Sequence, residues 1–360
     1  MAVYIIAEAG VNHNGSLGRA VDMIDCAKKM GADAVKFQMF RAGELASHKA
    51  EKAEYQVKNT GSHGNQLHML EQLELRPEDF RQLKAYSQEQ MIEFLVSPFD
   101  ICSLDYLVQE LGLSTIKVGS GEITNAPLLL QVARYKKQVI LSTGMSTLGE
   151  IENALAVLAL GYSDGNCCPS MENLQQSISS SAWSMLQDKV TLLHCTTEYP
   201  APFQEANLKV IQTLKNTLGL RTGFSDHTRG ITAAIAAVAL GAEVVEKHFT
   251  LDKSLPGPDH AASLEPFEFK QMVQGIRETE MALGDGIKRP SRSEFGNREI
   301  ARKSLVARLP IRTGELFTAD NLGIKRPGGG ISPFYYWYWL DKKADRDYEE
   351  DEMIIPWEVK

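Results

Sequence analysis

The sequence predicts an α/β protein, a (β/α)8 barrel (TIM barrel) followed by a small β-rich domain. Short β-branched runs alternate with helix-like segments up to Gly284, where a polar stretch rich in Gly, Pro and Ser begins. This alternation is typical of a parallel sheet with right-handed crossovers. Eight such units in about 250 residues are typical of the barrel. The alternative is an open doubly wound sheet, but no Gly-x-Gly-x-x-Gly pattern follows the first strand.

Eight segments have the length and β-branched content of buried strands. They are 3–8, 33–38, 92–97, 114–119, 138–143, 189–194, 220–225 and 243–248. Helix-like segments between them include 17–32, 127–134 and 228–242. The insertion at 39–90 predicts two helices that meet at Pro77, hanging over the catalytic mouth of the barrel. A polar stretch at 161–183 predicts a surface excursion.

The predicted domain organisation has three parts. Residues 1–284 form the barrel, 285–300 a flexible linker and 301–360 a small domain near the lower size limit for independent stability. Such a domain is expected to pack against another protein surface for stability.

Composition excludes several classes of protein. The 360 residues carry a net charge of −8, and they lack the basic stripe that nucleic-acid binders present. The longest apolar stretch is too short and too rich in alanine for a membrane span. The cysteines are odd in number and follow no signal peptide, which indicates reduced thiols in a cytoplasmic protein; they are Cys26, Cys102, Cys167, Cys168 and Cys195.

Every predicted strand ends in a polar or charged residue or is followed at once by one, and a purely structural barrel would not need this. Active sites of such barrels lie at the carboxyl ends of the strands. Because successive side chains of a strand point to opposite faces, Lys36 and Gln38 should face the lumen. The same argument places Lys117 inside and puts Glu246 and His248 on one face.

Two histidines follow neighbouring strands, His227 after the seventh and His248 at the end of the eighth. The first strand closes the ring beside the eighth, which brings Glu8 near His248. Two imidazoles and a carboxylate at one edge suit a divalent metal of the Mn, Zn, Fe or Co group, completed by water or substrate oxygen. The alternative is two unrelated histidines, each hydrogen-bonded in its own loop.

Lys36 and Lys117 lie within apolar strands, where lysine is rare unless it is paired. One interpretation is an internal salt bridge with Glu8 or Glu246. The other is an anion clamp, in which two ammonium groups act with the hydroxyls of nearby serines. Those serines are Ser97, Ser120 and Ser225. The stretch around Ser120 also has glycines that let backbone amides approach a phosphate.

Three further features are ambiguous from sequence. His194 suits the lumen or the packed core equally well. Cys195 lacks a base at a recognisable spacing, which argues against a thiol nucleophile. Asp259 could bind sugar hydroxyls or fix a turn.

Collinear motifs along nearly the whole chain carry a specific resemblance. They are "AEAGVNHNG", "VKFQ", "KAEYQVKNTG", "SPFD", "KVGSGE", "STGM", "HCTTEYP", "GFSDHT", "EKHFTLDK", "PGPDHAASLEP" and "KRPGGGISP". Together they resemble the sialic acid (nonulosonate) synthase family, and the C-terminal part resembles its antifreeze-like (SAF) domain. The resemblance implies a barrel enzyme that condenses phosphoenolpyruvate with an N-acetylated mannosamine-type sugar and releases phosphate.

The resemblance also implies roles for individual residues. His227 and His248 would hold a divalent metal, usually Mn²⁺. The residues expected to bind phosphoenolpyruvate are Lys36, Ser97, Lys117, Ser120 and Ser225, and those expected to line the sugar site are Glu8, Gln38, Tyr199 and Asp259. Arg326 would reach the sugar's acyl group from the partner subunit of a homodimer, because the small domain would cap the partner's barrel.

Two positions depart from the family pattern. Thr197 stands where some members have an asparagine that binds phosphoenolpyruvate, which puts this residue in doubt as a ligand. Ser97 replaces a threonine but keeps the hydroxyl. The aromatic and acidic segment 335–352 is not explained by the resemblance.

The sequence leaves several functions open. The first reading takes N-acetylmannosamine as the substrate, which would make the chain an N-acetylneuraminate synthase. A diacetamido-trideoxyhexose would make it a legionaminate or pseudaminate synthase. A Schiff-base aldolase could use Lys36 or Lys117 as its nucleophile. A non-catalytic ice-binding role is disfavoured, because the segment at 301–315 is strongly basic.

Overall fold

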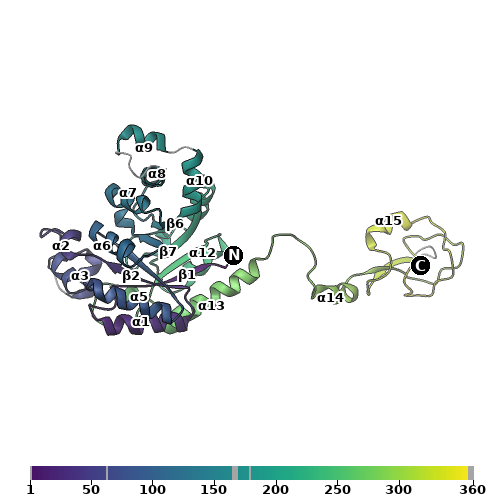
Figure 1. Cartoon of the computed structure of the whole chain (residues 1–360). Helices are drawn as coiled ribbons and strands as arrows, with labels where there is room; N and C mark the ends of the chain where they lie inside the picture. Colours follow the sequence, from purple (N-terminus) through teal and green to yellow (C-terminus); the bar gives the residue numbers. More distant parts are fainter. Residues whose placement is uncertain (1, 62–63, 164–168, 178–179, 356–360) are drawn as a thin grey trace. The chain divides into compact units, whose positions relative to one another are not determined.

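The computed structural model describes residues 2–61, 64–163, 169–177 and 180–355. The chain divides into two compact units between Gly284 and Asp285. In the described residues, the first unit carries an eight-stranded sheet and the second a two-stranded one (Figure 1).

All eight predicted strands are present, each within two residues of its predicted ends. They are β1 (Tyr4–Gly10), β2 (Ala34–Met39), β3 (Glu93–Pro98), β4 (Thr115–Val118), β5 (Gln138–Ser142), β6 (Val190–Cys195), β7 (Arg221–Asp226) and β8 (Val244–His248). Every ladder between them is parallel. The hydrogen-bonded order is β3-β2-β1-β8-β7-β6-β5-β4, and β4 packs against β3 to close the ring. The predicted barrel fold is confirmed.

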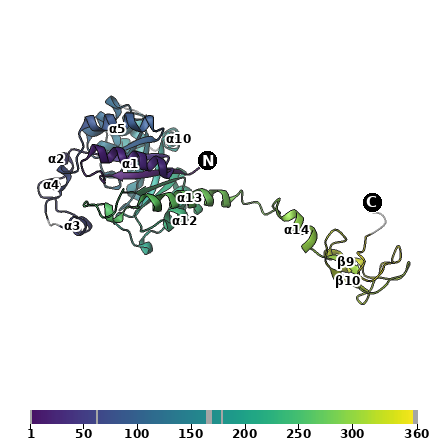
Figure 2. The same ribbon diagram turned by 90° about the horizontal axis from the view of Figure 1, so that it is seen from below.

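Helices surround the sheet and cover its outer face. The main ones are α1 (Leu17–Met30), α5 (Pro77–Glu89), α6 (Ile101–Asp105), α7 (Ala126–Arg134), α8 (Leu148–Ser163), α10 (Ser180–Lys189), α11 (Val210–Leu218), α12 (Thr232–Ala239) and α13 (Pro266–Leu283). The π-helix η1 (Tyr106–Glu110) follows α6, and three short 3-10 turns are η2 (Ser120–Glu122), η3 (Phe203–Glu205) and η4 (His260–Ala262). Helix α13 lies beside α1 (Figure 2), so the last helix of the unit closes the outer layer against the first.

The predicted insertion after β2 folds into α2 (Ala42–Leu45), α3 (Glu54–Thr60), α4 (Gln66–Glu71) and α5. The two helices expected around Pro77 are present, and Pro77 is the first residue of α5. Proline suits this position because the first turn of a helix has no internal partner for its N–H. Asn59 of α3 donates a 2.6 Å hydrogen bond to the carbonyl of Pro258, which ties α3 to the loop after β8.

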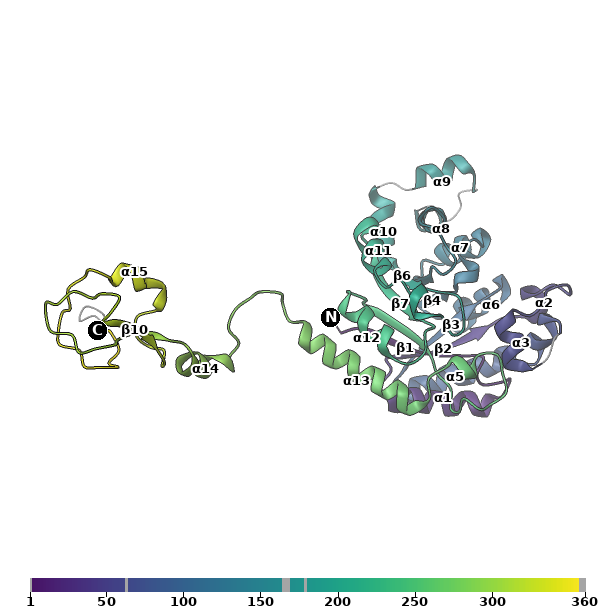
Figure 3. The same cartoon turned by 180° about the vertical axis from the view of Figure 1, so that it is seen from behind.

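The described part of the predicted surface excursion at 161–183 is largely helical. Helix α8 continues to Ser163, and α9 (Met171–Ser177) and α10 pack against it (Figure 3). Tyr162 and Ala182 are buried. The described side chains of residues 169–176 are exposed or half-buried, so this part lies at the surface as predicted, and 164–168 and 178–179 lie outside the described residues.

The lumen is layered along the strands. An apolar layer fills it toward the amino ends; its buried residues are Ile6, Ala34, Leu95, Ile140, Leu193 and Val244. Two residues further along each of these strands the lumen side chain is polar: Glu8, Lys36, Ser97, Ser142, Cys195 and Glu246. The strand period of two thus places a polar layer directly above the apolar one, toward the carboxyl ends.

The second unit has its own apolar core. It contains α14 (Glu294–Ala301), β9 (Ser304–Ala307), β10 (Leu322–Lys325), the turn η5 (Pro333–Tyr335) and α15 (Tyr336–Trp339), with β9 and β10 antiparallel. Helix α14 occupies part of the segment predicted as a flexible linker. Tyr348 is buried and Trp339 packs on Phe317 with ring centroids 5.6 Å apart. These aromatics of the unexplained segment therefore build the core of this small unit, whereas Phe334 and Trp337 are exposed.

No helix in the described ranges is long and apolar enough to cross a membrane. Cys26, Cys102 and Cys195 are free thiols, and Cys167 and Cys168 lie outside the described residues.

Candidate active site

A cavity of about 130 Å³ opens at the carboxyl ends of the strands. It brings together eleven of the residues predicted for catalysis, substrate and metal: Glu8, Lys36, Gln38, Ser97, Lys117, Ser120, Thr197, Tyr199, Ser225, His227 and His248. Further lining residues are Phe99, Gly119, Gly121, Ser142 and Glu246. Residues from strands distant in sequence thus meet at one place, as the barrel architecture requires.

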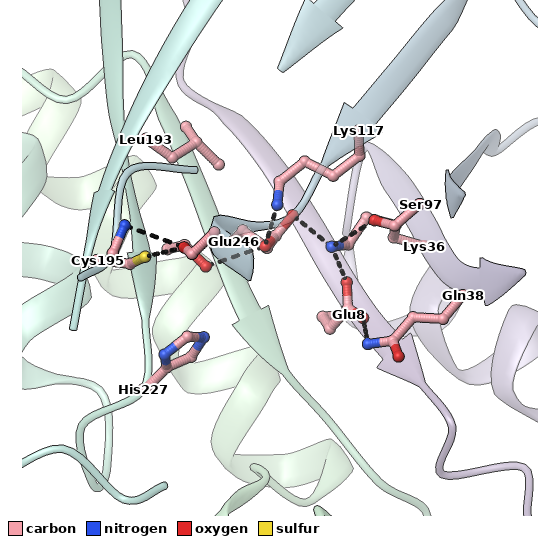
Figure 4. Close-up of polar contacts among 12 residues, drawn as sticks. Glu8, Lys36, Gln38, Ser97, Lys117, Leu193, Cys195, His227 and Glu246 are labelled. Atoms are coloured by element: carbon pink, nitrogen blue, oxygen red, sulfur yellow. Dashed lines mark hydrogen bonds and ion pairs between the residues drawn. The ribbon is translucent and has the colours of Figure 1, made fainter. Parts of the chain in front are cut away.

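The inner layer of the cavity consists of Glu8, Lys36, Lys117 and Glu246. Glu246 lies between the two lysines, 3.0 Å from Lys36 Nζ and 3.3 Å from Lys117 Nζ, and Lys36 also pairs with Glu8 (Figure 4). All four side chains are buried. The ion pairs inferred as one interpretation of the lysines are therefore present, with two cations and two carboxylates in balance.

Charges in the inner layer shift the pKa of Glu246 and that of Lys36. Burial alone would raise the pKa of Glu246, but Lys117 and Lys36 hold it well below its usual range. Burial lowers the pKa of Lys36 to about 7, and Glu246 opposes this shift. Removing one member would leave an uncompensated buried charge, which is far more costly than the intact cluster.

Hydroxyl groups line the cavity beside the lysines. Ser97 accepts a 3.4 Å hydrogen bond from Lys36, and Ser225 donates a 2.9 Å hydrogen bond to Glu246. The Oγ1 of Thr197 and the Oγ of Ser142 are buried without a hydrogen-bond partner. Such groups are uncommon in protein interiors, and a ligand oxygen in the cavity would satisfy them.

Gly144 allows the hydroxyls to come together. A Cβ at this position would lie 2.3 Å from Thr197 Oγ1 and 2.8 Å from both Cys195 Sγ and Ser120 Oγ. Its backbone N–H donates a 3.0 Å hydrogen bond to Ser120 Oγ. This amide of the "STGM" motif is therefore engaged with protein rather than turned toward a ligand.

The outer layer consists of Tyr199, His227 and His248. The Tyr199 ring lies 4.2 Å from the His227 ring and 5.6 Å from the His248 ring, and the two imidazoles are 5.6 Å apart, all between centroids. Burial lowers the pKa of His227 to about 4 and that of His248 well below its usual value. Both rings are consequently neutral near pH 7, so each has a nitrogen lone pair for a metal.

The donor chemistry of the two imidazoles suits a divalent metal. His227 Nδ1 lies 2.7 Å from the carbonyl of Thr196, and because a carbonyl only accepts, Nδ1 carries the proton and Nε2 the lone pair. His248 Nδ1 is buried without a partner. In the described residues no three His, Cys, Asp or Glu side chains are grouped around one metal position. Glu8 is the register partner of His248 across β1 and β8, as expected, but its carboxylate accepts a 3.2 Å hydrogen bond from Gln38 and pairs with Lys36.

Asp259 does not line this cavity. Asp259 is buried, and burial raises its pKa to about 6. Its charge contributes to raising the pKa of both Tyr55 and Tyr199, whose rings lie 5.0 Å apart, so it lies near the outer layer. Arg326 is an exposed residue of the second unit.

Sequence reasoning underestimated Glu246 and missed Tyr55. Glu246 was placed on the lumen face but assigned only as a partner for a salt bridge, whereas it is the common partner of both lysines and Ser225. Tyr55 of α3 packs on Tyr199. The only indication of it in the sequence was the motif "KAEYQVKNTG".

Two ambiguous residues are settled by their contacts. His194 is buried, bonds the carbonyl of Ala206 at 2.8 Å and stacks on Phe224 at 5.9 Å, so it belongs to the packed core. Cys195 Sγ lies 3.0 Å from Ser120 Oγ, and burial raises its pKa. A thiol in this state is a poor nucleophile.

Several known proteins are similar to this chain in sequence and in fold. The N,N'-diacetyllegionaminic acid synthase of Campylobacter jejuni is 51% identical over 350 residues, 97% of this chain and 98% of the relative. The human N-acetylneuraminate-9-phosphate synthase is 33% identical over 98% of this chain and 91% of its own length. The N-acetylneuraminic acid synthetase of Leptospira borgpetersenii, solved in complex with citrate, is 33% identical with a TM-score of 0.66 over 82% of this chain and 90% of that one. The pattern of the NeuB family matches residues 23–288, and the chain belongs to that family.

Proposed function

We propose that this chain condenses phosphoenolpyruvate with a diacetamido-trideoxyhexose to form N,N'-diacetyllegionaminic acid and phosphate. The cavity that combines a buried lysine pair with two neutral imidazoles supports the reaction class. The 51% identity to a diacetyllegionaminate synthase, against 33% to a neuraminate-9-phosphate synthase, supports this sugar. The sequence had placed N-acetylmannosamine first, so the relatives favour what was the alternative reading.

The inner layer suits the anionic substrate. Lys36 and Lys117 present two ammonium groups within a buried polar layer, and a phosphate or carboxylate oxygen would be held by charge-assisted hydrogen bonds. Ser142 and Thr197 have hydroxyls ready to donate. The carboxylates of Glu8 and Glu246 keep both lysines oriented, so binding needs little rearrangement of the side chains.

In this proposal His227 and His248 of the outer layer would hold a divalent metal, Mn²⁺, with oxygen ligands from water and substrate. Such a metal would act as a Lewis acid toward the carbonyl oxygen of the open-chain sugar. Tyr199 packs against both rings and limits their rotation.

The chain's own residues would then direct the chemistry. Lys36 and Lys117 hold phosphoenolpyruvate so that its C3 forms a bond to the sugar's aldehyde carbon, and the aldehyde oxygen gains a proton. Glu8 removes a proton from the water that adds at C2 of the former phosphoenolpyruvate. The resulting tetrahedral centre loses phosphate. Positioning of the two substrates supplies much of the rate in such a site.

Discrimination between sugars tests the proposal directly. Steady-state kinetics with phosphoenolpyruvate and a panel of N-acetylmannosamine, the legionaminate precursor and the pseudaminate precursor should give the highest kcat/KM for the diacetamido-trideoxyhexose of legionaminate. A preference for N-acetylmannosamine would overturn the sugar assignment and leave the reaction class intact.

A Schiff-base aldolase is the second candidate, because the lowered pKa of Lys36 is a property of amine nucleophiles. Borohydride reduction in the presence of pyruvate should leave the protein mass unchanged. A covalent adduct on Lys36 would overturn the proposed condensation.

We also propose a homodimer in which the second unit, an antifreeze-like domain, caps the partner's barrel through Arg326. Glu8→Ala disables a barrel and Arg326→Ala disables a cap. If the cap acts in trans, a heterodimer of the two variants has one intact site, so mixing the inactive proteins should restore activity. An inactive mixture with demonstrated subunit exchange would contradict the swapped arrangement.

A further inference from the structure

A second buried ion pair lies directly behind the two histidines. Asp226 ends β7 and Lys247 lies opposite it on β8, with Nζ and Oδ2 2.8 Å apart. The side chains are 0% and 1% exposed. Each residue immediately precedes one of the histidines, and strand alternation turns both away from the cavity.

Stability alone does not explain this pair. Two charges removed from water lose hydration that their attraction only partly restores, and well-packed apolar residues of similar volume often stabilise as much. The pair also constrains the geometry of the backbone around the two histidines.

The pair fixes the backbone on both sides of His227. Asp226 Oδ1 accepts the N–H of Thr228 at 2.8 Å and its hydroxyl at 2.7 Å. Lys247 Nζ also donates to the carbonyl of Thr228. The carbonyl of His227 accepts the N–H of Ala201 at 2.8 Å, so the main chain around this imidazole is held at several points.

The same pair sets the relation between the two strands. Its ammonium group belongs to β8, one residue before His248, and both of its acceptors belong to β7 and the turn that follows. A change in the offset of β7 against β8 at this end would break all of these contacts together. The separation of the imidazoles is thereby coupled to the pair.

We propose that Asp226 and Lys247 are positioning residues that hold His227 and His248 at the spacing required to bind one divalent metal. The inference rests on the proposed metal function. Partners behind metal ligands are commonly worth 10- to 100-fold in metal affinity, and here a charged cross-strand contact would fill that role for both ligands.

The test uses the full-length Asp226→Asn/Lys247→Met protein, which removes both charges together and leaves no lone buried ion. Glu243→Gln is the matched control, because Glu243 pairs with Lys215 and Arg221 at the opposite end of the same two strands. Mn²⁺ affinity is measured by electron paramagnetic resonance of unbound Mn²⁺, and thermal unfolding is followed in parallel. We expect affinity to fall about 10- to 100-fold in the double variant and less than about twofold in the control.

A second readout separates positioning from general damage. In metal-free protein, ¹⁵N NMR should show His227 with its proton on Nδ1, and the double variant should show a mixture of tautomers. If the double variant does not fold, Thr228→Val removes one contact to Asp226 and should give a smaller loss of affinity with the same tautomer change.

The outcomes distinguish the two proposals. A double variant that folds, binds Mn²⁺ as tightly as the wild type and keeps the Nδ1 tautomer overturns this inference alone. A wild-type protein that binds no divalent metal overturns the proposed metal function, and this inference with it.

Discussion

The inner and outer layers of the cavity handle polar groups in opposite ways. In the inner layer each charge faces an opposite one, and the lysines hold the pKa of Glu246 low. In the outer layer the imidazoles are neutral, His248 Nδ1 lacks a partner, and the nearby Asp259 has its pKa raised to about 6. A few ångströms along the same strands, the lumen changes from paired ions to neutral groups with open lone pairs. Our proposal assigns the anionic substrate to the lysines of the first layer and the metal cation to the imidazoles of the second.

The largest expected effect comes from emptying the outer layer. EDTA should abolish activity, and Mn²⁺ or Co²⁺ should restore it. His227→Ala and His248→Ala should lose metal binding while unfolding at nearly the wild-type temperature, because residues at the strand ends contribute little to the core. Full activity of a rigorously metal-stripped sample would contradict the assignment of a cation to this layer.

Changes in the inner layer should act on the anionic substrate. Lys36→Ala and Lys117→Ala each remove a charge-assisted contact, which costs about 1.5–3 kcal/mol, or roughly 10- to 100-fold in affinity. The KM for phosphoenolpyruvate should therefore rise more than the KM for the sugar. Lys215→Ala is the control, since that lysine is half exposed on α11. If only the KM for the sugar changed, the assignment of phosphoenolpyruvate to the inner layer would be wrong.

A third expected effect is on the pH dependence of stability, through Asp259. Its pKa rises from 3.8 in the unfolded chain to about 6 in the folded protein, so the folded state binds more protons between those values. Stability from this group is fully present below pH 3.8 and is lost as the pH rises through 6, a change of about 3 kcal/mol. Asp259→Asn should therefore gain in melting temperature relative to the wild type as the pH rises from 4 to 7.

Asp252→Asn provides a control of opposite sign in the same loop. Hydrogen bonds from Ser254 lower the pKa of Asp252, so its contribution is present above the unfolded pKa and lost as the pH falls. A flat difference between Asp259→Asn and the wild type across this range would mean that Asp259 is not desolvated.

The sequence predicts the barrel and the faces of its strands because both depend on local periodicity. Lys36, Gln38 and Lys117 were predicted to face the lumen because apolar residues alternate with them along their strands. The carboxyl ends of the strands indicate where the active site opens. The polar layer is predicted in the same way. The residue two positions after an apolar lumen residue also faces the lumen, as Ser97 does after Leu95.

Periodicity named Glu8 and Glu246 as possible partners of the two lysines, but it could not decide which contacts form across the lumen. Glu246 of β8 and Lys117 of β4 are four strands apart in the sheet order, and only the curvature of the closed barrel brings them to 3.3 Å. Tyr55 contacts Tyr199 because of the way the insertion after β2 folds. That insertion has no alternating strand pattern from which the direction of its side chains could be predicted. The role of Arg326 remains a prediction, since it depends on how two units assemble.

The most direct test of the two-layer account is a crystal structure of the full-length protein with Mn²⁺ and phosphoenolpyruvate, with anomalous scattering recorded at the manganese edge. The account predicts an anomalous peak within bonding distance of His227 and His248, and phosphoenolpyruvate oxygens in contact with Lys36 and Lys117. Manganese bound elsewhere, or the phosphate group lying against the imidazoles with the lysines still paired only to Glu8 and Glu246, would contradict it.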